Sequence, residues 1–257
     1  MAAGAFSDVL LERLEGDVAR LTLNRPKARN ALSFTVWEGL ADALDALERE
    51  TPPRALILCG AEGYFSAGGD IKLPPARGDG ALALAARVEL AQRVIQRVRA
   101  FPAPAIAAIE GGAIGLAWSL ALACDMIIAA ENARFQAPFA NLGIVPDGSL
   151  VWFLVRRLGR YEASEIVFNG RMVEAAEARA AGLVTRLVPP GQALSVALEA
   201  SRGLGSGNRK AVELIKRLLH QAETGDLSSV NATELAYAHI AQSGEEAARA
   251  KEGRRGS

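Results

Sequence analysis

The chain has 257 residues, of which 50% are hydrophobic and 23% are charged, a composition typical of a globular protein and outside the range of disordered chains. Lysine plus arginine and aspartate plus glutamate each number 29, so the formal net charge is zero. Because no excess of positive charge is available to attract phosphates, the composition argues against nucleic acid or an anionic membrane surface as the main partner.

The first half of the chain repeats strand-like, glycine-rich and helical segments. Strands are expected at 9–14 and 18–23, because apolar residues alternate in the second of them. Ser33 is expected to cap the helix that follows. The next elements are expected as a strand at 54–59, a loop at 60–69, a helix at 81–99, a strand at 104–109, a glycine-rich turn at 111–115, a short buried helix at 116–123 and a strand at 126–130. This order predicts an α/β fold with helices packed on a parallel sheet.

The sequence pattern changes after Pro189 and Pro190. Helices are expected at 195–203, 208–221 and 226–242, and a last segment begins with a possible capping box of Ser243 and Glu246. We therefore divide the chain into an α/β core (residues 1–190) and a helical module (191–257).

Cysteine usage and hydropathy predict the compartment. Cys59 and Cys124 lie in apolar runs and are expected to be buried thiols in a reducing environment. The most apolar segment, 103–130, contains Glu110 and Asp125 and falls short of the roughly 18 uninterrupted apolar residues of a membrane span. With no signal-peptide pattern at the N-terminus, a cytoplasmic protein is predicted.

Three motifs carry the functional signal. They are NRPKARNAL at 24–32, FSAGGDI at 65–71, and EGGAIG at 110–115 with LACD at 122–125. In this order and at these separations they resemble the crotonase superfamily, the enoyl-CoA hydratase/isomerase family. The resemblance implies a ββα spiral core with a C-terminal helical trimerisation module, a homotrimer or dimer of trimers, and an acyl-CoA thioester as substrate. It implies no cofactor besides the coenzyme A of that substrate.

The resemblance places an oxyanion hole at the main-chain amides of Gly69 and Leu116. A thioester carbonyl that becomes an enolate needs two donors aimed at its oxygen, and N–H groups serve where the chain approaches closely. Leu116 begins an expected helix, whose first N–H groups are unpaired. Many relatives have glycine at this position, so the leucine adds bulk beside the thioester while the main-chain donor remains.

Other residues are implied to bind the substrate. They are the cations Lys27, Arg29 and Lys72 for the coenzyme phosphates, Ala31, Ala67 and Ile71 along the adenine and pantetheine path, and Asp70, Gly112, Ser119 and Phe139. The alternative for any single cation is a solvated surface charge, and the alternative for the glycines is that they only permit tight turns.

The two glutamates that hydratases of the family use are missing. Counted along the motifs, their positions hold Ser119 and Phe139. Hydration needs one group that takes a proton from water and another that delivers a proton to carbon. Since serine and phenylalanine cannot replace this pair, an ordinary hydratase is disfavoured.

Asp147 occupies the position at which family isomerases place their acidic residue. One carboxylate beside an anion hole is sufficient to move a proton between two carbons, so the resemblance predicts an enoyl-CoA isomerase of fatty-acid or aromatic-acid metabolism. We expect Phe139, Leu142 and Val145 to raise the pKa of Asp147 by excluding water. The alternative role for Asp147 is to cap a helix that begins near Ser149.

Three other functions stay open. The first is a hydratase-type lyase whose water is positioned by other residues, and the second is a non-catalytic acyl-CoA-binding protein. The third is an aryl-CoA dehalogenase with Asp147 as nucleophile, but those enzymes have Trp where Phe139 stands and use a histidine base. His220 and His239 both lie in the C-terminal quarter, which also argues against a His-rich metal site.

Overall fold

The computed structural model describes residues 3–6, 8–73, 77–78, 83–204 and 208–243. Ser243 is the last residue of α8; Glu246, its partner in the expected capping box, and the rest of the segment 244–257 lie outside the described residues.

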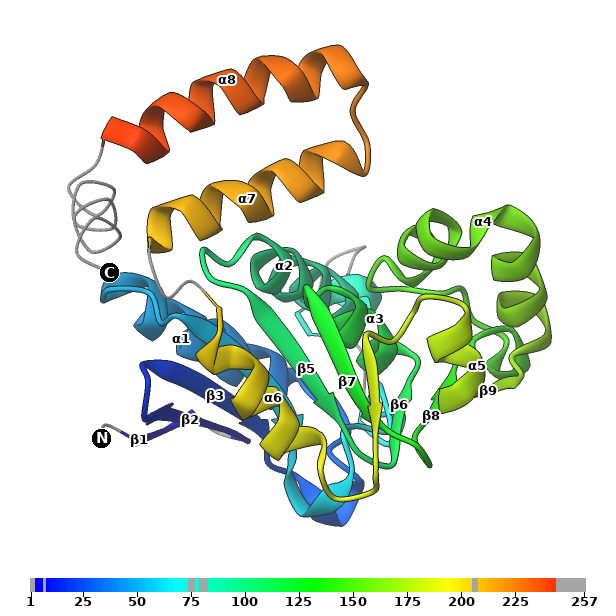
Figure 1. Ribbon diagram of the computed structural model, residues 1–257. Coiled ribbons are helices and arrows are strands. Elements are labelled where there is room, and N and C mark those ends of the chain that lie inside the picture. Colours follow the sequence, from blue (N-terminus) through cyan, green and yellow to red (C-terminus); the bar gives the residue numbers. More distant parts are fainter. Residues whose placement is uncertain (1–2, 7, 74–76, 79–82, 205–207, 244–257) are drawn as a thin grey trace.

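A seven-stranded sheet forms the centre of the molecule (Figure 1), in the order β1-β2-β3-β4-β5-β7-β10. Its strands are β1 (Ala3–Phe6), β2 (Val9–Leu14), β3 (Val18–Leu23), β4 (Ala55–Gly60), β5 (Ala105–Ile109), β7 (Met126–Ala130) and β10 (Arg186–Val188). The first three strands are antiparallel, and from β3 onward every pair is parallel. A small second sheet contains β6 (Gly112–Ile114), β8 (Arg134–Gln136) and β9 (Met172–Glu174).

Helices cover both faces of the large sheet. On one side lie α1 (Phe34–Arg49), α2 (Ala86–Ala100) and α3 (Leu116–Leu122), and on the other lies α6 (Ala193–Arg202). The remaining helices are α4 (Leu150–Asn169) and α5 (Ala175–Ala180) near the small sheet, and α7 (Arg209–Ala222) and α8 (Leu227–Ser243). Short 3-10 turns occur as η1 (Pro26–Ala28), η2 (Ala61–Gly63), η3 (Ala83–Ala85) and η4 (Ala140–Leu142).

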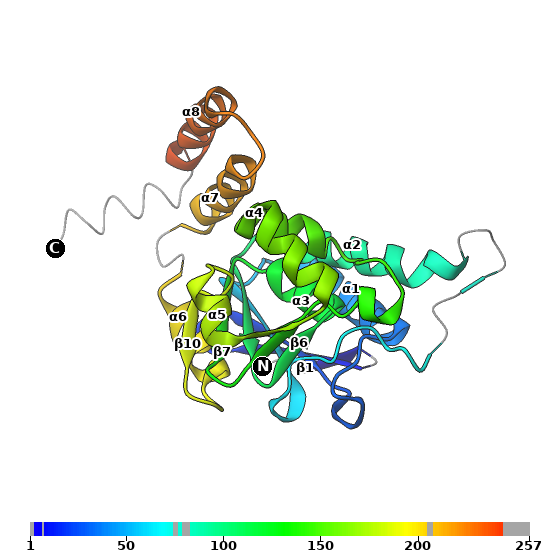
Figure 2. The same cartoon turned by 90° about the vertical axis from the view of Figure 1, so that its right-hand side faces the viewer.

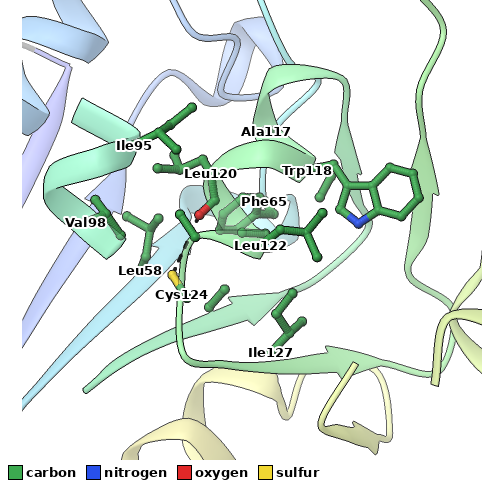
Figure 3. Close-up of a cluster of buried hydrophobic side chains, with 14 of the residues drawn as sticks. Leu58, Phe65, Ile95, Val98, Ala117, Trp118, Leu120, Leu122, Cys124 and Ile127 are labelled. Carbon is green, nitrogen blue, oxygen red and sulfur yellow. Dashed lines mark hydrogen bonds between the residues drawn. The ribbon is translucent and has the colours of Figure 1, made fainter. Parts of the chain in front are cut away.

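The larger hydrophobic core encloses α3. Every residue of this helix is buried, as expected for a helix that is apolar on all sides. Figure 3 shows Leu120 facing Ile95 of α2, while Trp118 lies on another side, its ring 5.6 Å from that of Phe135. Packing on all sides fixes the position of the α3 N-terminus, which becomes part of the site described below.

Both cysteines are buried and free of disulfides, as predicted. Cys124 lies in the core beside α3 (Figure 3), and its Sγ is 3.7 Å from the carbonyl oxygen of Leu120. Burial raises the pKa of the Cys124 thiol to about 12. The thiol is therefore protonated at neutral pH and is a packing group rather than a nucleophile.

A smaller core lies on the opposite face of the sheet. Ala193 and Ala197 of α6 pack there with Ile57, Ile106 and Ile128. The division of the chain at residue 190 stays a prediction; α6, which follows this point, packs on the sheet. The helices that project from the body are α7 and α8, which form a hairpin (Figures 1 and 2).

A buried ion pair anchors α7 to the sheet. Nζ of Lys216 lies 2.7 Å from Oδ2 of Asp125 and donates to the carbonyl oxygen of Ala103 at 3.1 Å. Asp125 follows α3 and leads directly into β7, so the hairpin is held by the loop between these elements. Among the described residues, no helix combines the length and apolar character required to cross the lipid bilayer.

The α/β class and the parallel sheet are confirmed. The helix predicted at 81–99 is instead the turn η3 followed by α2, which begins at Ala86. The turn predicted at 111–115 contains β6, because Gly112 pairs with Arg134 of β8. Strands of three residues such as β6 and β8 are too short to show an alternating pattern.

Candidate active site

A cavity of about 620 Å³ is bounded mainly by four segments that are far apart in the sequence. They are the loop after β3, the turn after η2, the junction of β6 with α3, and the loop between η4 and α4. All but two of the predicted site residues line this cavity, namely Lys27, Arg29, Ala31, Ala67, Gly69, Asp70, Ile71, Lys72, Leu116, Phe139 and Asp147.

The turn that carries Gly69 is held on both sides. The N–H of Leu32 donates to the oxygen of Gly68 at 2.7 Å, and the N–H of Asp70 donates to the oxygen of Leu32 at 3.1 Å. Gly68 has φ +89°, and a Cβ there would lie 2.3 Å from the oxygen of Ile114, so only glycine fits. The N–H of Gly69 itself has no acceptor among the described residues.

A second free amide lies at the start of α3. Gly115, with φ +55°, donates its N–H to Gln136 and accepts from Trp118. In the described part of the chain, the N–H of Leu116 finds no acceptor, as is usual at a helix start. A Cβ at Gly69 would lie 3.5 Å from Cδ1 of Leu116. The two residues predicted to form the anion hole are therefore neighbours on one cavity wall.

Asp147 lies in the loop before α4 and is partly buried. Its Oδ1 is shielded from solvent and has no hydrogen-bond partner within the described ranges. Burial raises the pKa of the Asp147 carboxyl to about 6, while the main-chain N–H of Asp147 itself and, more weakly, the positive charge of Arg87 act in the opposite direction. A carboxyl with this pKa can exchange a proton near neutral pH.

The alternative role of Asp147 as a side-chain helix cap is wrong. The capping position of α4 is Ser149, which makes no side-chain capping bond. Asp147 takes part only through its main-chain carbonyl, which accepts from the N–H of Leu150 at 3.2 Å and from Oγ of Ser119 at 3.3 Å. The carboxylate therefore makes no capping bond to α4.

The apolar surroundings of Asp147 differ in part from those predicted. Phe139 is buried and Leu142 lines the cavity, but Val145 is 80% exposed and does not line it. Ile144 lines it instead. Gly148 packs so closely that a Cβ there would lie 2.6 Å from Cδ2 of Leu116, which brings the Asp147 loop against the start of α3.

The carboxylate of Asp70 is held by neighbouring groups of the protein. Its Oδ2 lies 2.8 Å from Nη1 of Arg25, and its Oδ1 accepts from the N–H of Lys72 at 3.0 Å. Although burial alone would raise its pKa, Arg25 and the amide of Lys72 hold it below the ordinary value. Asp70 lines the cavity, but its carboxylate is already paired with Arg25, which was not predicted; its role in substrate binding stays a prediction.

Gly112 and Ser119 do not line the cavity, contrary to prediction. Gly112 lies in β6 against Tyr64, and a Cβ there would be 2.7 Å from the tyrosine oxygen. Ser119 is fully buried one turn into α3, where its hydroxyl supports the loop of Asp147. Both residues were assigned by counting along the motif. In the structure, however, Gly112 packs against Tyr64 and Ser119 is buried in the protein interior.

Cations gather along the cavity. Lys27, Arg29 and Lys72 are exposed, and no carboxylate of the described residues pairs with them. Arg87 of α2 also lines the cavity, although the sequence analysis did not identify it. An arginine in the first turn of an amphipathic helix resembles an ordinary surface charge, so the sequence carried no signal for it.

Comparison with known proteins places these observations in a family. The model of the family described as Enoyl-CoA hydratase/isomerase matches residues 13–255. A probable enoyl-CoA hydratase of Rhizobium meliloti is 36% identical, with 84% of this chain and 82% of the relative covered. A 2,3-dehydroadipyl-CoA hydratase of Escherichia coli is 34% identical, with 85% and 84% covered.

Solved structures show the same architecture. An enoyl-CoA hydratase from Polaromonas superposes with a TM-score of 0.86 at 34% identity, covering 91% of each chain. A putative enoyl-CoA hydratase from Thermobifida fusca, solved in complex with acetoacetyl-CoA, superposes with a TM-score of 0.80 at 28% identity, covering 91% of this chain and 94% of the other.

Proposed function

The chain belongs to the enoyl-CoA hydratase/isomerase family, and within this family we propose that it binds acyl-CoA thioesters and shifts their double bond, with Asp147 as the proton shuttle. The alternatives are a hydratase-type lyase and a non-catalytic acyl-CoA-binding homologue.

One observation carries the proposal. Asp147 lines the same cavity as Gly69 and Leu116, and its buried Oδ1 has no hydrogen-bond partner among the described residues. An unsatisfied buried polar atom is costly, so its retention favours a role in chemistry over a role in packing.

The proposed reaction needs only these groups. The ionised Asp147 carboxylate removes a proton from C2 of a 3-enoyl thioester, and the thioester oxygen takes up the negative charge of the resulting dienolate. The N–H groups of Gly69 and Leu116 stabilise that oxygen. The protonated Asp147 then returns the proton to C4, which leaves a 2-enoyl thioester and regenerates the base.

The cations at the cavity support a coenzyme A thioester. The exposed ammonium and guanidinium groups of Lys27, Arg29 and Lys72 suit phosphates, for which charge-assisted bonds are strong. Relatives of this chain are mostly named hydratases, which favours the second candidate function. Hydration needs a second proton-transfer group, however, and the other carboxylate lining the cavity, Asp70, is bound to Arg25.

A panel of thioesters tests the proposal. The purified protein is expected to convert 3-hexenoyl-CoA into 2-hexenoyl-CoA, detected by chromatography, and to hydrate crotonyl-CoA at least 10-fold more slowly. Faster hydration of crotonyl-CoA would establish the hydratase. Turnover of none of the 2-enoyl, 3-enoyl and dienoyl thioesters, with binding seen by calorimetry, would indicate a non-catalytic homologue. Absence of binding at millimolar acetyl-CoA would contradict acyl-CoA recognition altogether.

We also propose assembly into a homotrimer or a dimer of trimers. Ile215 and Leu219 of α7 are 55% and 61% exposed, and Leu235 of α8 is 78% exposed, a large apolar surface for a projecting hairpin. Light scattering at micromolar concentration is expected to give at least three times the 27.0 kDa chain mass. A single species at the monomer mass would contradict this proposal.

A further inference from the structure

We propose that Arg87 binds a carboxylate carried by the acyl group of the substrate, so that this enzyme prefers thioesters of dicarboxylic acids. The inference rests on the proposed acyl-CoA binding and adds to it the chemical class of the acyl group. It follows from how the Arg87 guanidinium is held, from the charge around it, and from the lining of this part of the cavity.

The guanidinium is fixed at one nitrogen and free at the others. Nη1 of Arg87 donates to the main-chain oxygen of Asp70 at 2.7 Å, with a longer contact of 3.4 Å to that of Leu73. Over the described residues, Nε and Nη2 have no acceptor and no carboxylate forms an ion pair with Arg87. A guanidinium presents its donors in a planar fork that matches a carboxylate. Arg87 thus offers a preorganised, unused donor pair at the cavity.

The anchor places this charge beside the turn of Gly69. Asp70 directly follows Gly69, whose N–H is proposed to hold the thioester oxygen, so the guanidinium lies next to the turn that binds the reacting carbonyl. Arg87 is also close enough to Asp147 for its charge to influence that carboxyl. Lys27 and Arg29 lie instead on and after η1, on the loop that follows β3.

The existing acids do not neutralise Arg87. Asp70 is paired with Arg25 at 2.8 Å, and in the described part of the structure the hydrogen bonds of Arg87 go to main-chain oxygens and not to Asp147. The neighbouring lining is apolar, with Leu142, Ile144 and Phe139. A hydrocarbon acyl chain would displace the water that hydrates the free N–H groups of Arg87 and would offer no hydrogen-bond acceptor in its place. Burying donors without acceptors is costly. A carboxylate would satisfy them with charge-assisted hydrogen bonds.

The test compares matched thioesters that differ only in a terminal carboxylate. Calorimetry measures Kd for succinyl-CoA against butyryl-CoA, glutaryl-CoA against pentanoyl-CoA, and adipyl-CoA against hexanoyl-CoA, with the wild-type protein, Arg87→Gln and Arg93→Gln. Arg93 is the control, because it lies on the same helix and its side chain is 65% exposed. These saturated thioesters require no turnover, so the result does not depend on the identity of the reaction.

For at least one pair, Arg87→Gln is expected to raise the ratio of the carboxylate Kd to the neutral Kd by about 10- to 100-fold, the range for a hydrogen bond to a charged group. Arg93→Gln should leave this ratio unchanged. Arg87→Lys keeps the positive charge but loses the planar pair of guanidinium donors, so it should give a smaller rise in this ratio. It replaces Arg87→Gln in the test if that variant unfolds early in a thermal scan.

Two results would overturn the inference. The first is an unchanged ratio for all three pairs in both Arg87 variants. The second is an equal loss for carboxylate and neutral thioesters together with weaker binding of free coenzyme A, which would assign Arg87 to a phosphate. If the wild-type protein binds none of these thioesters, the proposed acyl-CoA binding itself is wrong, and the inference falls with it. Turnover of 3-hexenoyl-CoA without a carboxylate effect would leave the proposed function standing and reject only the role of Arg87.

Discussion

Asp147→Asn is expected to lower the rate of the double-bond shift at least about 100-fold, the lower end of what a positioned acid or base contributes. The amide keeps the size of the side chain but cannot accept and return a proton. The rate is measured with 3-hexenoyl-CoA at saturating concentration. Asp42→Asn is the matched control, because Asp42 is an exposed acid on α1 and is absent from the cavity wall.

The same substitution is expected to stabilise the protein above pH 6. The pKa of Asp147 is raised from 3.8 to about 6 in the folded state, so between these values the folded protein binds a proton that the unfolded chain releases. Stability therefore falls as the pH rises through this window. Above it, the buried charge costs on the order of 3 kcal/mol, and asparagine removes that cost.

Denaturant unfolding at pH 8 and at pH 4 measures this effect. Asp147→Asn should be more stable than the wild type at pH 8, and the difference should shrink at pH 4, where the carboxyl is largely protonated in the folded state. A variant that is less stable at both values would indicate a structural role for the carboxylate. Full isomerase activity in a folded Asp147→Asn protein would show that another group is the base.

Much of the fold was predictable because its signals are local. The alternation at 18–23, the Ser33 cap and the apolar run at 126–130 each concern neighbouring residues, and all three are found in the structure. The small sheet was missed, because β6 is stabilised by pairing with β8, about twenty residues further along the chain. Such pairing leaves no periodic pattern within three residues.

In the site, too, features with a local sequence signal could be predicted, whereas contacts between distant residues could not. The family resemblance led to Gly69 and Leu116, and both line the same cavity; their role as donors to the thioester oxygen stays a prediction. Side-chain roles were harder to predict. The carboxylate of Asp70 forms an ion pair with Arg25, which is 45 residues away in sequence, and only the three-dimensional structure shows this pairing.

Leu116→Pro tests the second donor of the proposed anion hole and is expected to lower kcat about 100- to 1000-fold relative to Leu116→Ala, the usual effect of losing one such donor. Leu116 is the first residue of α3, a position at which proline fits a helix because its missing N–H would be unpaired. Gly115 precedes it and has no Cβ to clash with the proline ring. The substitution therefore removes one N–H while the helix is kept.

Leu116→Ala is the required reference, because Leu116 is only 4% exposed and either substitution removes a buried side chain. A Leu-to-Ala change in a core typically costs about 2–5 kcal/mol, and both variants should show a loss of this kind in thermal unfolding. Rates are compared at saturating 3-hexenoyl-CoA, so that weaker binding caused by the proline ring affects KM and not the comparison. Equal kcat in the two variants would show that the N–H of Leu116 does not stabilise the enolate and that the anion hole must be assigned elsewhere.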